Sequence, residues 1–192
     1  MNIQNDSNGL QSIDFKKIWK EAVLNLGHST IIVTGKTGVG KSTLINAVFS
    51  KDVAETGVGK PITNEIKEYS LENFPISIID TIGFEAKRFE EIKNKLFDEI
   101  TRRRNDPDPT KHVNVCWYCI AYGVPRIELA EIEFLKELSK FVKIIVVLTQ
   151  YYDINDGSFY SKVVEALYST DIKVIKLVAQ TKYSIPAYGL DK

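Results

Sequence analysis

The segment that most constrains this chain is a glycine-rich octapeptide at residues 35–42, which reads Gly-Lys-Thr-Gly-Val-Gly-Lys-Ser. A β-branched run, residues 30–34, comes directly before it, and a helix-compatible run, residues 44–50, follows. This order of strand, glycine-rich turn and helix is the setting that the pattern G-x-x-x-x-G-K-[ST] requires. Glycines allow a turn whose backbone N–H groups point inward, and such a concave set of amides binds anions. The sequence therefore predicts a loop that binds a polyphosphate.

Two side chains complete the predicted chemistry of this loop. Lys41 opens the following helix, whose N-terminal dipole end favours phosphate, and its ammonium group is expected to reach the β- and γ-phosphates. The hydroxyl of Ser42 is expected to coordinate Mg²⁺. The nucleotide-contacting residues predicted from the loop are Lys36, Thr37, Gly38, Val39, Gly40, Lys41, Ser42 and Thr43.

Strand patterns alternate with helix patterns along the rest of the chain, which favours a three-layer αβα fold with a mostly parallel six-stranded sheet and helices on both faces. Residues 51–64 are predicted as a connecting loop, and a loop of this length inside a domain is often functional. Strands are predicted at residues 30–34, 65–71, 76–79, 113–121, 143–148 and 172–178, and the later helices at 86–100, 126–141 and 158–169.

The two ends of the chain are predicted separately from the domain at residues 28–192. Residues 1–9 are expected to form a disordered tail, and residues 10–27 an amphipathic helix, because apolar side chains recur there at helical spacing. The apolar stripe of this helix is narrow and its polar face is not strongly basic. Packing on the domain is therefore favoured over binding to a membrane surface or a partner.

Charge and hydropathy exclude several classes of protein. Twenty-five Lys and Arg residues balance 25 Asp and Glu residues, so the basic excess typical of non-specific nucleic-acid binding is missing. The longest purely aliphatic run, residues 144–148, is far shorter than the roughly 20 residues of a membrane span. The polar start of the chain does not resemble a signal peptide. We expect a cytoplasmic protein without a transmembrane segment.

Cys116 and Cys119 have the C-x-x-C spacing that can indicate a redox or zinc site. Both residues fall inside a predicted strand, where positions i and i+3 point to opposite faces of the sheet. Their sulfur atoms should therefore not meet. We interpret them as two buried thiols.

The order of the motifs in this chain resembles that of Ras-like and Era-like GTPases of the translation-factor-related (TRAFAC) class of P-loop proteins. The resemblance spans residues 30–190 and rests on the glycine-rich loop, a threonine in the long connector, and Asp-Thr-Ile-Gly at residues 80–83. Members closer to this chain show a Gly-Lys-Pro-x-Thr segment, a Trp-Tyr strand and an Arg-Ile-Glu helix start. These correspond here to residues 59–63, 117–118 and 126–128.

The resemblance implies a role for each matching residue. Thr63 would place its hydroxyl on Mg²⁺ and its N–H on the γ-phosphate, so that the connector orders only with a triphosphate. Asp80 would hold the metal through water, and Gly83 would bring its N–H to the γ-phosphate. The implied metal ligands are thus Ser42, Thr63 and Asp80, and the implied catalytic residues are Lys41, Thr63 and Gly83.

Two departures from the family pattern affect the expected activity. Phe84 occupies the position at which Ras-like members carry the glutamine that orients the attacking water. Phenylalanine cannot bond water, so we expect unaided hydrolysis at or below about 10⁻⁴ s⁻¹. The guanine-reading pattern [NT]-K-x-D is also altered, because residues 149–153 read Thr-Gln-Tyr-Tyr-Asp.

In this altered segment Gln150 replaces the lysine, whose stem packs along the base in the family, and the aspartate comes one residue late, at Asp153. The resemblance implies that Gln150 and Asp153 are the base-contacting residues of this segment. A one-residue bulge could bring the Asp153 carboxylate to the base, and without such a bulge guanine selectivity would be weak. The resemblance also places a base-contacting loop after the last strand, at Ala179 and Gln180. The family fold closes with a helix at the point where this chain reaches residue 192, so we expect the chain to be a fragment of a longer polypeptide. The helix at 10–27 is then expected to cover the sheet surface that the missing helix leaves bare.

The leading interpretation is a Mg²⁺-dependent GTPase that switches between GTP and GDP states. A nucleotide-binding scaffold with negligible turnover and a P-loop ATPase or kinase remain as alternatives. The expected partners are a guanine nucleotide, an unidentified protein effector and, in a nucleotide-dependent dimer, a second copy of the chain.

Overall fold

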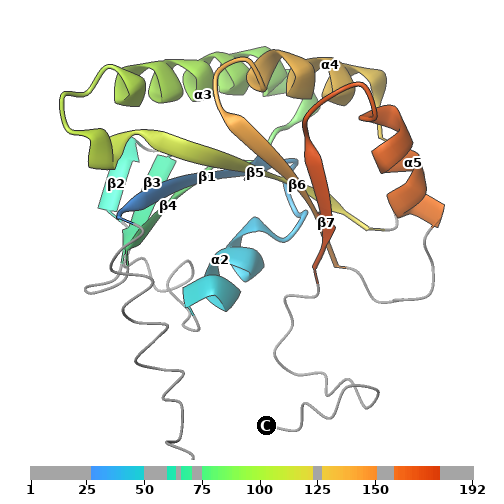
Figure 1. Ribbon diagram of the computed structural model, residues 1–192, viewed down its shortest axis with the longest axis horizontal. Coiled ribbons are helices and arrows are strands. Elements are labelled where there is room, and N and C mark those ends of the chain that lie inside the picture. The colour runs from blue at the N-terminus through green and yellow to red at the C-terminus, as the bar shows by residue number, and fades with distance from the viewer. Residues whose placement is uncertain are drawn as a thin grey trace, which may run out of the picture.

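The computed structural model describes residues 27–49, 60–63, 66–70, 75–122, 127–150 and 158–177. These residues form a seven-stranded sheet in the order β2-β3-β4-β1-β5-β6-β7 (Figure 1). The strands are β1 (Ser29–Gly35), β2 (Lys60–Thr63), β3 (Ile66–Ser70), β4 (Ile76–Thr81), β5 (Val113–Ala121), β6 (Lys143–Thr149) and β7 (Lys173–Lys176). The α-helices are α2 (Lys41–Phe49), α3 (Phe89–Arg104), α4 (Leu129–Leu138) and α5 (Ser158–Ala166), with 3₁₀ turns at Ala86–Arg88 and Pro109–Lys111.

The sheet is mostly parallel, as predicted. β4, β1, β5, β6 and β7 run parallel to one another, whereas β3 is antiparallel to β4 and β2 is antiparallel to β3. The six predicted strands and the αβα class are confirmed. The interpretation of residues 51–64 as loop throughout is wrong at one end, because β2 adds a short edge strand there. Pro61 weakens the strand signal, but an edge strand tolerates a residue that has no N–H group.

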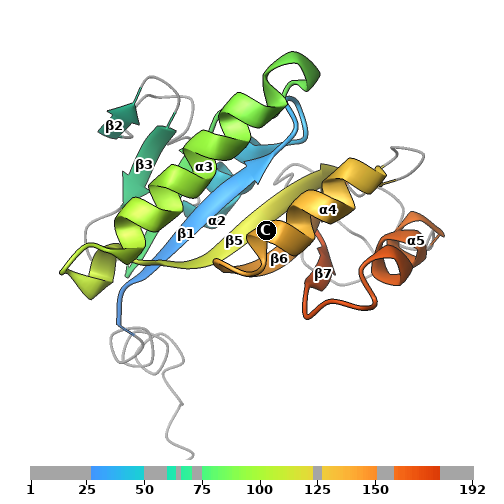
Figure 2. The same cartoon turned by 90° about the horizontal axis from the view of Figure 1, so that it is seen from above.

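Helices cover both faces of this sheet. α3 and α4 lie side by side across one face, and α2 lies beneath the other (Figures 1 and 2). The strands between them are nearly continuous apolar runs, as expected for parallel strands that are buried on both sides. Cys116 belongs to the core cluster under α3, α4 and α5, whereas Cys119 belongs to the cluster against α2. The prediction that the two thiols point to opposite faces is therefore confirmed.

The end of α3 contains a buried ion network that the sequence did not indicate. The Arg103 side chain is buried, although arginines at a helix end are usually solvated. Its Nε donates to Glu99 Oε1 at 2.6 Å, and its Nη2 donates to Glu68 Oε2 on β3 at 2.9 Å. Arg102 donates to the same Glu99 carboxylate from the solvent side. The network joins α3 to the antiparallel edge of the sheet.

Two predicted segments lie outside the described residues: the tail at 1–9 and, except for Gly27, the helix at 10–27. Among the residues that the structure does describe, no helix is both long and apolar enough to cross a bilayer.

Candidate functional site

The topology places a crevice at the carboxyl end of β1. From β1 the chain passes through α2 to the strands on one side of the sheet, and from β4 it passes through α3 to β5 on the other side. α2 and α3 lie on opposite faces (Figure 1). Open α/β sheets bind ligands at such a switch point, outside the carboxyl ends of their strands. The glycine-rich loop, which begins at Gly35, occupies this position.

The glycines of the loop are required by its backbone geometry. Gly38 and Gly40 have φ values of 80° and 93°, which side-chain-bearing residues rarely adopt. A Cβ atom on Gly35 would run into the carbonyl oxygen of Cys119 on β5. The loop can therefore follow its tight path only with glycine at these positions. α2 begins directly afterwards and directs its free N–H groups toward the crevice.

Lys41 lies inside the loop rather than in solvent. Its side chain is largely buried, and its Nζ donates to the carbonyl oxygens of Gly35 at 3.2 Å and of Lys36 at 3.1 Å. Burial lowers the pKa of Lys41, and the nearby Asp80 carboxylate opposes this shift. The ammonium group is thus held at the centre of the loop by two weak acceptors that a phosphate oxygen can replace.

Asp80, the penultimate residue of β4, lies near this ammonium group. Its Oδ1 is buried and has no hydrogen-bond partner among the described residues. Burial raises the pKa of Asp80 to about 6, against the influence of Lys41 and Lys67. A buried carboxylate oxygen without a donor suits a divalent cation, which prefers oxygen ligands. Ser42, at the start of α2, is exposed, and Thr63 ends β2, where its side chain lies outside the described residues.

Gly83 brings the segment after β4 into contact with the loop. A Cβ atom at this position would lie 2.6 Å from the Cα and N atoms of Thr37, so only glycine fits. Phe84 N–H donates to Gly35 O at 3.0 Å, and Thr37 N–H donates to Phe84 O at 3.3 Å. Two motifs that are far apart in the sequence therefore lie against one another.

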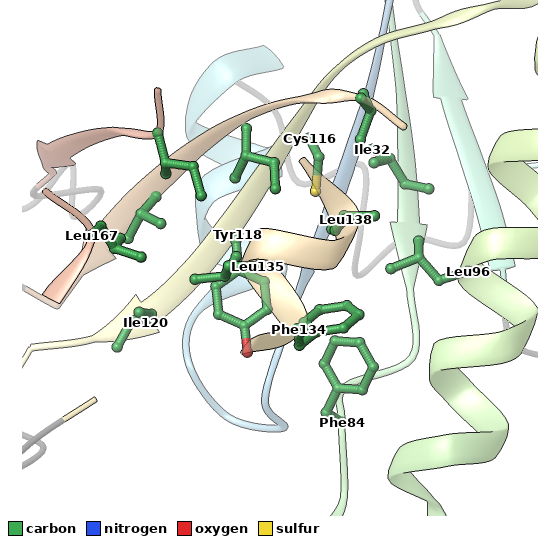
Figure 3. Packing of buried hydrophobic residues seen from close by; sticks show 14 of the residues in the cluster. Ile32, Phe84, Leu96, Cys116, Tyr118, Ile120, Phe134, Leu135, Leu138 and Leu167 are labelled. Carbon is green, nitrogen blue, oxygen red and sulfur yellow. The ribbon is translucent and has the colours of Figure 1, made fainter. Parts of the chain in front are cut away.

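Phe84 explains why the position after Gly83 does not carry a polar side chain. Its ring is 4% exposed and contacts Phe89 and Phe134, with both ring centroids at 5.2 Å (Figure 3). The side chain anchors the segment after β4 to the core under α3 and α4. It points into the protein, where it can neither contact nor orient water at the crevice.

Replacing Phe84 with glutamine should therefore not create a water-positioning group. The Phe84→Gln variant is expected to lose about 2–3 kcal/mol of unfolding free energy, because the core loses an aromatic ring and gains an amide. Its hydrolysis rate should not exceed that of the wild type. Urea denaturation and single-turnover hydrolysis measure the two quantities. Faster hydrolysis with unchanged stability would contradict this placement of the side chain.

The end of β6 holds the loop from its other side. Thr149 Oγ1 lies within hydrogen-bond distance of the carbonyl oxygens of Val39 and Ile120. Gln150, whose backbone has a φ of 55°, donates from Nε2 to Gly38 O at 3.1 Å. Gln150 was predicted to contact the base, and in this structure its amide contacts the phosphate loop. The contact of Thr149 with the loop was not predicted, although a polar residue at the carboxyl end of a buried strand can indicate a functional position.

Several predicted residues remain apart or undescribed. Val39 is buried against the α2 face, whereas Thr37 in the loop and Ser42 and Thr43 in the first turn of α2 are exposed. The Lys36 ammonium group reaches toward α4, where it pairs with Glu131. The predicted base contacts Asp153, Ala179 and Gln180 lie outside the described residues.

Comparison of the sequence with known proteins finds one matching family and several similar proteins. The sequence profile of the family described as 50S ribosome-binding GTPase matches residues 30–150. Human septin-9 is 27% identical over an alignment 168 residues long, which covers 74% of this chain and 28% of that protein. Zebrafish (Danio rerio) neuronal-specific septin-3 is 31% identical over an alignment 147 residues long, which covers 62% of this chain and 40% of the relative. The chain thus spans less than half the length of these relatives.

Solved structures show the same fold at low sequence identity. A probable GTP-binding protein engB matches with a TM-score of 0.55 and 24% identity, covering 79% of this chain and 89% of that one. Toc33 from Arabidopsis thaliana, in complex with Mg²⁺ and GMPPNP, matches with a TM-score of 0.55 and 19% identity, covering 88% and 77%. A dimerization-deficient mutant of Toc33 matches with a TM-score of 0.54 and 19% identity, over the same shares of the two chains.

Proposed function

We propose that this chain, which belongs to the 50S ribosome-binding GTPase family, binds GTP and GDP and hydrolyses GTP slowly. The family match also confirms the resemblance to a TRAFAC-class GTP-binding domain. The observation that carries the proposal is the phosphate loop, whose positive-φ glycines surround the buried ammonium group of Lys41. The loop lies at the switch point of the sheet, beside Asp80. Such a loop stabilises a nucleotide polyphosphate through main-chain amides and one cation.

Mg²⁺ is part of the proposal. Ser42, Thr63 and Asp80 would hold it, and the unpartnered Oδ1 of Asp80 supports this assignment. When bound, the ion would neutralise charge on the β- and γ-phosphates. The chain's own groups would act beside it: Lys41 would contact both phosphates, and the N–H of Gly83 would orient the γ-phosphate.

The base contacts are proposed to follow β6 and β7. Asp153 would accept hydrogen bonds from guanine, and Ala179 and Gln180 would line the other side of the base. Gln150 would act mainly on the loop, since its amide donates to Gly38 O. Guanine selectivity would therefore depend on the Asp153 carboxylate.

A second candidate function is a scaffold that binds nucleotide with negligible turnover. The burial of Phe84 favours this alternative, because the position that usually orients water is occupied by a core side chain. An effector or a second copy of the chain would then supply any missing catalytic group. The dimerization-deficient Toc33 mutant makes self-association worth testing here. A cytoplasmic location stays a prediction.

A competition titration tests the proposed function. GTP should displace a fluorescent GDP analogue from the purified chain at least about tenfold better than ATP does, because ATP cannot satisfy a guanine-reading carboxylate. EDTA should weaken GTP binding, because the phosphates then lose the divalent ion. The Asp153→Asn replacement should reduce the difference between the affinities of the chain for GTP and for XTP. Equal displacement by ATP would favour an ATPase, and no displacement by any triphosphate would refute the proposal.

Single-turnover hydrolysis of GTP distinguishes a switch from a scaffold. We expect measurable cleavage at or below about 10⁻⁴ s⁻¹ for the isolated chain. The rate should be measured at increasing protein concentration, with gel filtration in GDP and in a non-hydrolysable GTP analogue. A rate equal to that of GTP in buffer at every concentration would support the scaffold instead.

A further inference from the structure

A buried carboxylate on α4 connects three elements around the phosphate loop. Glu131 is 6% exposed, and its Oε2 accepts from Lys36 Nζ at 3.0 Å and from the backbone N–H of Glu128 at 3.3 Å. Its Oε1 accepts from the hydroxyl of Tyr118 on β5 at 3.1 Å. The capping box that Glu131 forms with Glu128 explains one of these bonds. The bonds to Lys36 and Tyr118 join α4 to the site.

Lys36 belongs to the phosphate loop and makes contacts there through both its backbone and its side chain. Its carbonyl oxygen accepts from Lys41 Nζ at 3.1 Å, and its backbone forms a parallel bridge with Phe84. Its side chain reaches Glu131 and, at 3.4 Å, the more exposed Glu128. The residue whose side chain contacts α4 thus also supplies a backbone carbonyl oxygen to the Lys41 ammonium group.

The electrostatics favour a firm contact between Lys36 and α4. Burial alone would lower the pKa of Lys36, but the hydrogen bond and charge of Glu131, together with Glu128, raise it overall. Burial, followed by the Glu131 carboxylate, raises the pKa of Tyr118, so its hydroxyl stays a neutral donor. Glu131 is buried, whereas the Lys36 side chain is 43% exposed. Removing Lys36 therefore leaves the buried Glu131 carboxylate without this counter-charge, which costs more than losing a pair at the surface.

We propose that Glu131 is a positioning residue for the phosphate loop, which holds Lys36 against α4 and thereby fixes the backbone of residues 35–37 for the bound phosphates. The inference rests on the proposed function, since the phosphates are those of GTP and GDP. Glu131 does not touch the nucleotide and acts only through Lys36. If it served solely as the cap of α4, its replacement would change stability and leave phosphate binding intact.

The test measures the affinity of fluorescent GDP and GTP analogues for Glu131→Gln and Lys36→Met at a temperature well below unfolding. We expect Kd to rise about tenfold for both nucleotides, because residues 35–37 also support the phosphates of GDP. The double variant should bind no more weakly than either single variant, since both changes break one contact. Lys36→Arg keeps the charge and should restore binding to within about twofold of the wild type.

Glu137 provides a matched control on the same helix. It pairs with Lys93 at 2.6 Å, and neither residue adjoins the loop. Glu137→Gln should leave Kd unchanged. Hydrogen exchange of the nucleotide-free protein gives a second readout: the amides of residues 36–38 should exchange faster in Glu131→Gln and at the wild-type rate in Glu137→Gln.

The outcomes separate the two proposals. Wild-type Kd and wild-type exchange in Glu131→Gln would overturn the inference, while nucleotide binding by the wild type would leave the proposed function standing. A lower melting temperature with unchanged Kd and loop exchange would reduce Glu131 to a helix cap, which also overturns the inference. Failure of the wild type itself to bind either nucleotide would refute the proposed function, and the exchange measurement would still decide whether Glu131 fixes the loop.

Discussion

Lys41→Ala should abolish measurable GTP and GDP binding, with a loss of at least roughly 100-fold in affinity. The ammonium group lies within hydrogen-bond distance of two loop carbonyls, so it is already positioned for phosphate oxygens that enter the loop. Hydrogen bonds to a charged group contribute about 1.5–3 kcal/mol each. The contributions of contacts with two phosphates add in free energy, so their factors in affinity multiply. Fluorescence titration with labelled GDP and GTP measures the loss.

Lys140→Ala is the control for this variant. Lys140 is an exposed lysine outside the loop, and within the described ranges no ion pair includes it, so its removal should leave both affinities unchanged. Circular dichroism should show that Lys41→Ala keeps the native helix and strand content. Retained nucleotide affinity in a folded Lys41→Ala protein would contradict both the site and the proposed function.

Arg103→Ala should lower the free energy of unfolding by about 3–5 kcal/mol, because it leaves the carboxylate of Glu99 buried and short of a partner. For a domain of this size the melting temperature should fall by on the order of 10 °C. Arg102→Ala, which removes a half-exposed partner of the same carboxylate, should cost about 1 kcal/mol or less. Equal effects of the two replacements would contradict the buried network.

The same network should make stability depend on acid. Burial disfavours the charge on Glu99, but hydrogen bonds from Arg102 and Arg103 keep its pKa below the ordinary value of 4.5. The contribution of Glu99 is therefore present above pH 4.5 and is lost as the pH falls through its folded-state pKa. Urea denaturation between pH 3 and 7 should show a smaller acid loss in Arg103→Ala than in the wild type.

The parts of the site that sequence could predict are those that local chemistry determines. Gly38 and Gly40 adopt backbone angles that glycine tolerates, so their pattern identified the loop without knowledge of its neighbours. Gly83 was expected near the γ-phosphate, and its contact with Thr37 explains why no larger residue fits there. The side chain of Gln150 was expected at the base, and its direction toward Gly38 depends on a backbone angle that the sequence pattern did not indicate.

The contacts that escaped prediction join residues far apart in the chain. Glu131 carries no motif, and its pairing with Lys36 exists because α4 packs on the same face of the sheet as Tyr118. Phe84 was identified as a departure from the family pattern, but only its packing on Phe134 shows that the side chain anchors the segment after β4. β2 escaped prediction because a four-residue edge strand depends on its pairing with β3.

By itself the sequence determined the alternation of strands and helices, the polyphosphate loop and the class of fold, because side-chain periodicity and glycine conformations act over a few residues. Tertiary structure alone decided which distant donors meet which acceptors: Lys36 with Glu131, and Arg103 with Glu68. The physical reason is that the strength of a charged contact depends on how completely distant elements exclude water from it, and that exclusion arises only when the sheet and its helices pack together.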